Sequence, residues 1–91
     1  MPTARGGIAS GVLEGKIVVL GGEGNDDDPS GVFAQVELYD PATDEWTALP
    51  DMAVPRHGMT AAVDGDGLAV PGGATREGFG AVATFDLYFL R

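Results

Sequence analysis

Few side chains in this sequence could do acid–base or nucleophilic chemistry. There is one histidine, His57, and no cysteine. A nucleophilic triad would therefore need His57 as the base for Ser10 or Ser30, and nothing in their spacing favours that arrangement. Neither G-x-x-x-x-G-K-[ST] nor a G-x-G-x-x-G followed by a helix is present. The sequence therefore predicts no catalytic residue, no cofactor and no enzymatic activity.

Carboxylates are the other chemically capable group. Asp26, Asp27 and Asp28 are consecutive, and a second group follows at Asp40, Asp44, Glu45 and Asp51. Adjacent aspartates on extended chain point in different directions, and their spacing does not match the alternating aspartates of an EF-hand loop. We therefore predict no metal site. The run is interpreted as a solvated loop, with contact to a basic partner as the alternative.

The charge balance limits the class of partner. The chain has 5 basic and 14 acidic residues, for a net charge of −9. Such a chain is repelled by phosphate backbones and anionic lipids, so we predict binding to neither nucleic acid nor membrane. No apolar run approaches the ~18 residues of a transmembrane helix, and the N-terminus lacks a signal-peptide core. A cytoplasmic location is the resulting prediction.

The elements that must position these side chains are short. The 91 residues are 44% hydrophobic, enough for one small core. Fifteen glycines and six prolines indicate tight turns between short elements instead of long helices.

The chain repeats itself. At an offset of 51, Arg5 meets Arg56, Val19 meets Val70, and Gly21-Gly22 meet Gly72-Gly73. At an offset of 46, later segments match as well, with Tyr39 on Phe85 and Asp40 on Asp86. On this alignment the second copy lacks five residues between the glycine doublet and the next apolar segment.

Both copies predict strands. Residues 17–20 form a β-branched apolar run bounded by glycines, which is typical of a buried strand. Further strands are predicted at residues 32–39, 45–49, 58–63, 68–70 and 79–87. Residues 40–44 and 64–67 read as turns, with Asp40 capping the first of them. We therefore expect four strands in the first copy and three in the second, each glycine doublet ending the second strand.

These residues resemble the kelch repeat. Each copy has a basic residue at its start, an apolar strand ending in a glycine doublet and an aromatic residue further on, and the first copy adds Tyr39-Asp40-Pro41 and Trp46. The resemblance implies an all-β fold of four-stranded antiparallel propeller blades. The predicted organisation is one full blade, repeat 1 at residues 1–51, and an incomplete second blade, repeat 2 at residues 52–91, whose last strand is missing. Tyr39, Trp46 and Phe85 are expected to be packing residues, and Trp46→Ala is expected to destabilise the chain by about 3–5 kcal/mol, the usual cost of removing a buried large aromatic side chain.

The resemblance also suggests where a partner would bind. In kelch propellers, the positions of Arg5 and Arg56 lie near loops that often bind partners, and so does the loop with Asp26, Asp27 and Asp28. These five residues are the predicted partner-binding set. The alternative for Arg5 and Arg56 is structural, because a residue present in both copies can serve the repeat itself by bonding backbone carbonyls.

The predicted function is a non-enzymatic kelch-repeat protein-interaction module, or a fragment of a propeller. The first alternative is a structural unit that self-assembles into a closed ring, and a weaker one is part of a glycan-binding or glycan-processing propeller. Two blades cannot close a ring of roughly four to eight. We therefore expect a homo-oligomer or a protein partner, with the apolar tail at residues 87–90, including Tyr88 and Phe89, at the contact.

Overall fold

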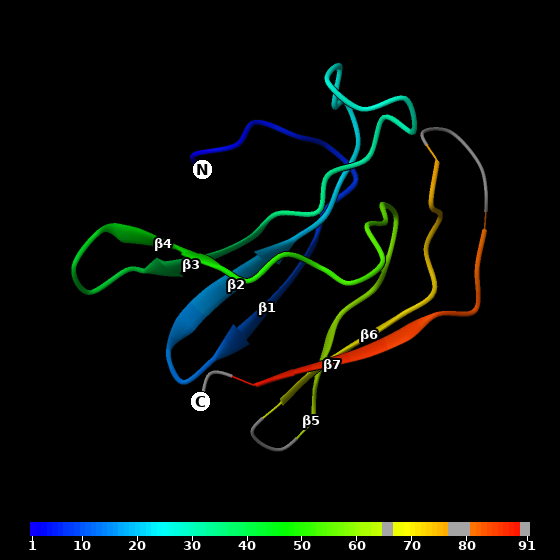
Figure 1. The fold of residues 1–91 in the computed structure, drawn as a ribbon. Coiled ribbons are helices and arrows are strands. Elements are labelled where there is room, and N and C mark those ends of the chain that lie inside the picture. Colours follow the sequence, from blue (N-terminus) through cyan, green and yellow to red (C-terminus); the bar gives the residue numbers. More distant parts are fainter. Residues whose placement is uncertain (65–66, 77–80, 90–91) are drawn as a thin grey trace.

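The computed structural model describes residues 1–64, 67–76 and 81–89, which form two antiparallel sheets (Figure 1). Sheet 1 has the order β1-β2-β3-β4, with strands Ala9–Leu13, Lys16–Leu20, Val36–Asp40 and Glu45–Leu49. Sheet 2 has the order β5-β6-β7, with strands Ala62–Asp64, Gly67–Pro71 and Phe85–Phe89. The all-β fold and the four-plus-three strand count are confirmed. In this part of the chain there is no helix that could cross a membrane.

Local sequence explains the hairpins of sheet 1. Glu14 and Gly15 both have positive φ, 52° and 75°, as a two-residue hairpin loop that matches the strand twist requires. At the β3–β4 turn, Asp40 Oδ1 accepts a hydrogen bond from the Ala42 amide at 3.0 Å, which confirms the predicted cap. The glycine doublets directly follow β2 and β6, as predicted. In the predicted turn at 64–67, residues 65 and 66 lie outside the described residues.

The predicted alignment between the third strands of the two repeats is wrong by three residues. Val19 pairs with Glu37 in sheet 1, and its counterpart Val70 pairs with Asp86 in sheet 2. The third strands therefore correspond at an offset of 49, which makes Tyr88, and not Phe85, the counterpart of Tyr39. Because side chains alternate between faces, a three-residue shift exchanges the two faces of β7.

The third strands are also shorter than predicted. Val32 and Ala81 form only isolated bridges, with Glu23 and Ala74. The regular strands begin at Val36 and Phe85. Residues 79 and 80 of the predicted strand at 79–87 lie outside the described residues.

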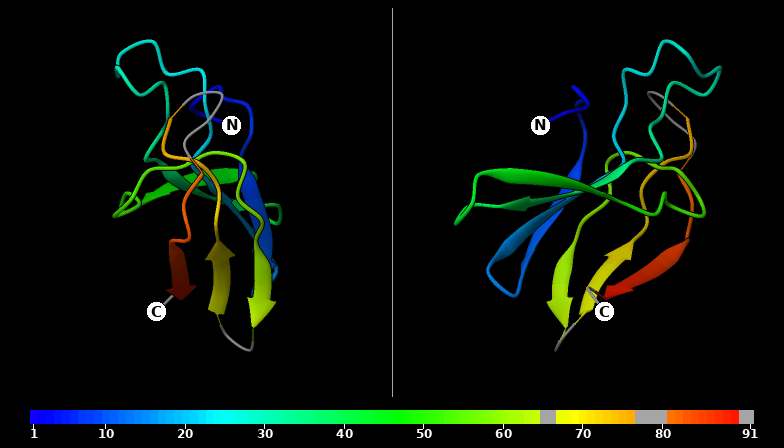
Figure 2. Two further views of the ribbon diagram at one scale, coloured as in Figure 1. Left: turned by 90° about the vertical axis from the view of Figure 1, so that its right-hand side faces the viewer. Right: turned by 60° about the vertical axis from the view of Figure 1, so that its left-hand side comes forward.

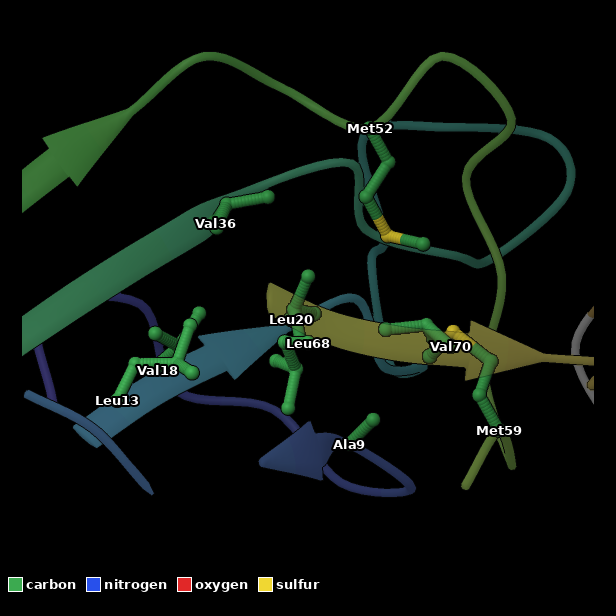
Figure 3. Close-up of a cluster of buried hydrophobic side chains, with 9 residues drawn as sticks. All are labelled: Ala9, Leu13, Val18, Leu20, Val36, Met52, Met59, Leu68 and Val70. Carbon is green, nitrogen blue, oxygen red and sulfur yellow. The ribbon is translucent and has the colours of Figure 1, made fainter. Parts of the chain in front are cut away.

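The hydrophobic core lies between the two sheets (Figures 2 and 3). Leu20 of β2 and Leu68 and Val70 of β6 are fully buried. A Cβ at Gly11 would overlap Leu68 Cδ1, so glycine at this position of β1 lets sheet 2 approach. The buried side chains of sheet 1 define its inner face: Ala9, Leu13, Val18, Leu20 and Val36.

Tyr39 and Trp46 pack together on the opposite, outer face of sheet 1. They form a cross-strand pair with ring centroids 4.9 Å apart. Both side chains are half-buried, so Trp46 is less buried than that expected cost requires. The cost of Trp46→Ala should accordingly fall below the ~3–5 kcal/mol typical of a buried large aromatic.

Candidate functional site

Arg5 and Arg56 occupy the same position in their two sheets. Arg5 Nη1 donates to the carbonyl oxygens of Gly21 at 2.9 Å and Gln35 at 2.7 Å, and Nη2 pairs with Glu37 Oε1 at 2.8 Å. These bonds join the segment after β2 to the segment before β3. Arg5 therefore links the adjoining ends of two neighbouring strands, β2 and β3.

Arg56 repeats this arrangement in sheet 2. Its Nη1 donates to Gly72 O at 2.7 Å and to Thr84 O at 3.1 Å, its Nε donates to Val54 O at 3.2 Å, and its Nη2 pairs with Asp86. Glu37 and Asp86 correspond by strand register, so each sheet carries a carboxylate for its own arginine.

Neither guanidinium is exposed. Both arginine side chains have 0% exposed area. Burial lowers the pKa of Arg5 from its ordinary value, while the charge of Glu37 and its hydrogen bond to Arg5 oppose that shift. Both guanidinium groups are bonded within their own sheets and have no exposed area, so neither is positioned to contact a partner in this structure.

The loop at residues 23–32 places the three aspartates on the surface. It extends beyond the strand ends and is drawn in cyan in Figure 1, and Asp26, Asp27 and Asp28 are all exposed. Asp28 Oδ1 accepts from the Ser30 amide at 2.8 Å and from the Ser30 hydroxyl at 2.6 Å. These bonds lower the pKa of Asp28.

Hydrogen bonds also fix the base of this loop. The amides of Gly24 and Asn25 both donate to Gly31 O, and the Asn25 side chain donates to Val32 O at 3.0 Å. The loop thus holds its shape while its carboxylates face solvent. Within the described ranges, no group of three or more acidic, histidine or cysteine residues is arranged to hold a metal ion.

His57 joins the two sheets instead of activating a serine. Its Nδ1 lies 3.3 Å from Glu23 Oε2, and its Nε2 lies 2.5 Å from Arg76 O. Ser30 donates its hydroxyl to Asp28, and Ser10 is exposed on β1. The contacts of the imidazole therefore connect segments of the fold and do not form a nucleophile–base pair.

A pocket that the sequence did not predict opens beside β7. Its volume is about 510 Å³. Val36, Leu38 and Leu49 of sheet 1 line one side, and Tyr88 and Phe89 of β7 line the other. Among the described residues, no strand pairs with the second edge of β7. The pocket therefore combines apolar walls with free backbone groups on a strand edge.

Sheet 1 shows what such a position accommodates. There β4 pairs with β3, and Trp46 lies against Tyr39. Tyr88 is the counterpart of Tyr39 and lines the pocket. Burial, with a smaller contribution from the Asp86 charge, raises the pKa of the Tyr88 phenol. A fourth strand on β7 would thus place an aromatic side chain in this pocket.

Comparison with known proteins agrees with this geometry. The sequence profile described as Kelch motif matches residues 4–53. A Kelch-like protein, terF, of Aspergillus terreus is 41% identical over 78 residues, covering 86% of this chain and 17% of that protein. The Influenza virus NS1A-binding protein homolog of Mus musculus is 35% identical over 74 residues, covering 81% of this chain and 11% of that protein.

A solved structure extends the likeness to the fold. The structure of YjhT superposes with a TM-score of 0.68 and 28% sequence identity, covering 79% of this chain and 21% of that chain. The chain therefore spans about one-fifth or less of each of these three proteins.

Proposed function

The chain belongs to the kelch-repeat family, and on that premise we propose that it is a non-enzymatic protein-interaction module. The name of the mouse relative states that it binds another protein, which supports a binding role. The buried arginines and the engaged His57 leave no charged group poised for catalysis at these positions. The cytoplasmic location remains a prediction from the sequence.

The open edge of β7 and the pocket beside it are the observation that carries this proposal. An extended peptide can add to an exposed sheet edge, where backbone bonds supply affinity and side-chain pockets supply specificity. The pocket walls are mainly aliphatic and aromatic, so they favour one large apolar side chain. The favoured ligand is an extended segment that pairs with β7 and places an aromatic ring beside Tyr88.

A segment of the chain itself can serve as a probe of the β7 edge. A labelled synthetic peptide with the sequence of residues 43–50, which contains Trp46, should bind the Phe85→Asp chain. Phe85 lies outside the pocket lining, and this variant is expected to be monomeric, as argued below. Replacing the peptide tryptophan by alanine should weaken binding by about tenfold or more, because a large buried aromatic anchor contributes more than 1.4 kcal/mol. Fluorescence polarisation measures the affinity, and hydrogen exchange should show protection at residues 85–89.

Two substitutions on β4 provide matched controls. Leu49→Asp places a charge in the pocket wall, whereas Ala48→Asp places the same charge on the opposite face of the same strand. Only Leu49→Asp should weaken peptide binding. Equal loss in both variants, or protection away from β7, would exclude the edge as the binding site.

The acidic loop is a second proposed contact within the same module. Asp26, Asp27 and Asp28 are exposed on a loop whose base is hydrogen-bonded, so they present negative charge to a basic partner. Their role as partner contacts remains a prediction.

Its test compares two changes of equal charge. The Asp26→Asn, Asp27→Asn, Asp28→Asn triple variant should bind an oligolysine peptide more weakly than the parent chain at ~0.15 M salt, where distant charges are screened. The control replaces Asp44, Glu45 and Asp51 by their amides, which also removes three exposed carboxylates. Isothermal titration should show a loss only for the loop variant. The same loss in both would mean that net charge, not the loop, attracts the peptide.

Self-association is the second candidate function. Both outward sheet faces expose large apolar side chains, which favours it. No feature of the described residues favours the glycan-directed alternative.

A further inference from the structure

Sheet 2 exposes a row of large apolar side chains on its outer face. Phe85, Leu87 and Phe89 of β7 are 61%, 46% and 54% exposed. They alternate along the strand and so lie on one face, and Ala69 of β6 pairs with Leu87 on that face. A contiguous apolar face of this kind marks an interaction surface more often than scattered exposed residues do.

Sheet 1 has an open apolar face as well. Val12 and Ile17 are 58% and 36% exposed and form a cross-strand pair. Tyr39 pairs with Ile17, and Trp46 with Tyr39, so the four side chains form a continuous stripe across the sheet. The molecule thus has one open apolar face at each end of the two-sheet stack.

The interface between the two sheets shows how these faces fit. The inner face of sheet 2 carries Leu68, Val70 and Tyr88, whose counterparts in sheet 1 are Ile17, Val19 and Tyr39 on the outer face. Likewise, Val36 on the inner face of sheet 1 corresponds to Phe85 on the outer face of sheet 2. The open face of sheet 1 is therefore the kind of surface that the open face of sheet 2 is built to receive.

Backbone contacts at the junction of the two sheets also have no counterpart among the described residues on the open face of sheet 2. Where the sheets meet, the Gly22 amide donates to Arg56 O at 2.9 Å, and the Gly58 amide donates to Gly7 O at 2.7 Å. A Cβ on Gly21 would collide with Arg56 O, whereas the nearest atom to a Cβ on its counterpart Gly72 is Val82 O at 4.0 Å. The second repeat thus occupies the space next to Gly21, whereas the corresponding space next to Gly72 holds no closer atom of the described residues than Val82 O.

The closest contact differs between the two interfaces. Leu68 of sheet 2 packs directly over Gly11 of sheet 1. Their counterparts in the open faces are Ile17 and Ala62, so a contact between two copies would bring an alanine methyl group against an isoleucine. The two sheets would therefore be slightly further apart at this point than they are within one copy.

We propose that the outer face of sheet 2 binds the outer face of sheet 1 of a second copy of this chain, head to tail. The stacking would repeat the contact between the two sheets within one copy. Because the two surfaces differ, the contact is heterologous and each copy keeps one face free for the next. Rings of about four to eight sheets would need roughly two to four copies. This inference deepens the second candidate function. Leu87 and Phe89 also line the pocket beside β7, whereas Val12 and Phe85 do not, so substitutions at Val12 and Phe85 test the docking faces separately from the pocket.

The test uses one charge on each face. Val12→Asp blocks the sheet 1 face, and Phe85→Asp blocks the sheet 2 face; both side chains are more than half exposed, so the fold should survive. In sedimentation velocity at ~0.15 M salt, where charge repulsion is screened, the parent chain should be oligomeric. Each variant alone should associate at least about tenfold more weakly than the parent chain. An equimolar mixture should form a one-to-one dimer and nothing larger, because each variant still has one intact, complementary face.

Controls distinguish the loss of this contact from the effects of added charge and of unfolding. Ala42→Asp adds the same charge in the β3–β4 turn, away from both faces, and should sediment like the parent chain. Thermal melts check folding, and Ile17→Asp with Leu87→Asp form a second pair if either first variant unfolds. A monomeric parent chain, a mixture of folded variants that stays monomeric, or equal dissociation by Ala42→Asp would each overturn the proposal.

Discussion

Gly21→Ala should lower the free energy of unfolding by about 2–5 kcal/mol, the sum of two separate penalties. Gly21 has a φ of 62°, in the left-handed region, where a side chain costs about 1–2 kcal/mol. An added Cβ would also meet Arg56 O and lie 2.8 Å from Met59 Cε. Since Arg56 O accepts the hydrogen bond from Gly22, the clash disturbs the contact between the two sheets.

The matched control is the same substitution one repeat later. Gly72 has a φ of 71°, but its nearest atom to an added Cβ is 4.0 Å away. Gly72→Ala should therefore show only the conformational penalty, about 1–2 kcal/mol. Urea unfolding of both variants should be compared in the Phe85→Asp background, so that association does not contribute. Equal destabilisation by the two substitutions would mean that the second repeat does not pack on Gly21.

Arg56→Met should destabilise the chain by about 3–5 kcal/mol, because it breaks a buried ion pair by removing one partner. The Arg56 side chain has no exposed area and bonds five groups: Asp86 and the carbonyl oxygens of Val54, Val70, Gly72 and Thr84. Without the guanidinium, these acceptors lose their donor next to the core. A small domain with a total stability of about 5–15 kcal/mol would lose much of its margin.

Two further variants separate the ion pair from general damage. Arg76 is exposed, so Arg76→Met should change stability by only about 0.5 kcal/mol or less. Arg56→Met combined with Asp86→Leu should recover part of the loss, because the second substitution removes the unpaired carboxylate. Chemical unfolding measures all of them. If Arg56→Met unfolds at the same urea concentration as Arg76→Met, the bonds of the Arg56 side chain contribute nothing to the stability of sheet 2.

Local signals in the sequence predicted most of the fold. The glycine doublets, the Asp40 turn and the short apolar runs each depend on a few neighbouring residues, and β2, β4 and β6 lie where these signals predicted them. No range was predicted for β1, and β5 begins at Ala62 instead of at residue 58. The register of β7, and with it the residue that corresponds to Tyr39, could not be derived in this way. Its register depends on the length of the connection after Gly73, and the match of Tyr39 with Phe85 was a plausible alternative to its match with Tyr88.

The candidate site was predictable only in part. The exposure of Asp26, Asp27 and Asp28 follows from a polar loop between strands. The burial of Arg5 and Arg56 had a signal that could have been used, since an acidic residue stands two positions before the tyrosine in both copies, at Glu37 and Asp86. The pocket beside β7 had no such signal, because its walls come from two sheets that are distant in sequence.

The docking faces and the pocket beside β7 both depend on the face-to-face packing of the two sheets, and nuclear Overhauser measurements on the Phe85→Asp chain test this packing most directly. Leu68 lies so close to Gly11 that no side chain fits between them. Strong cross-peaks between the Leu68 methyl groups and the Gly11 α-protons are therefore expected, together with cross-peaks that confirm the β1–β2 and β6–β7 pairs. Intact strand pairs without any contact between Leu68 and Gly11 would contradict the stacked arrangement, and with it the docking faces and the pocket.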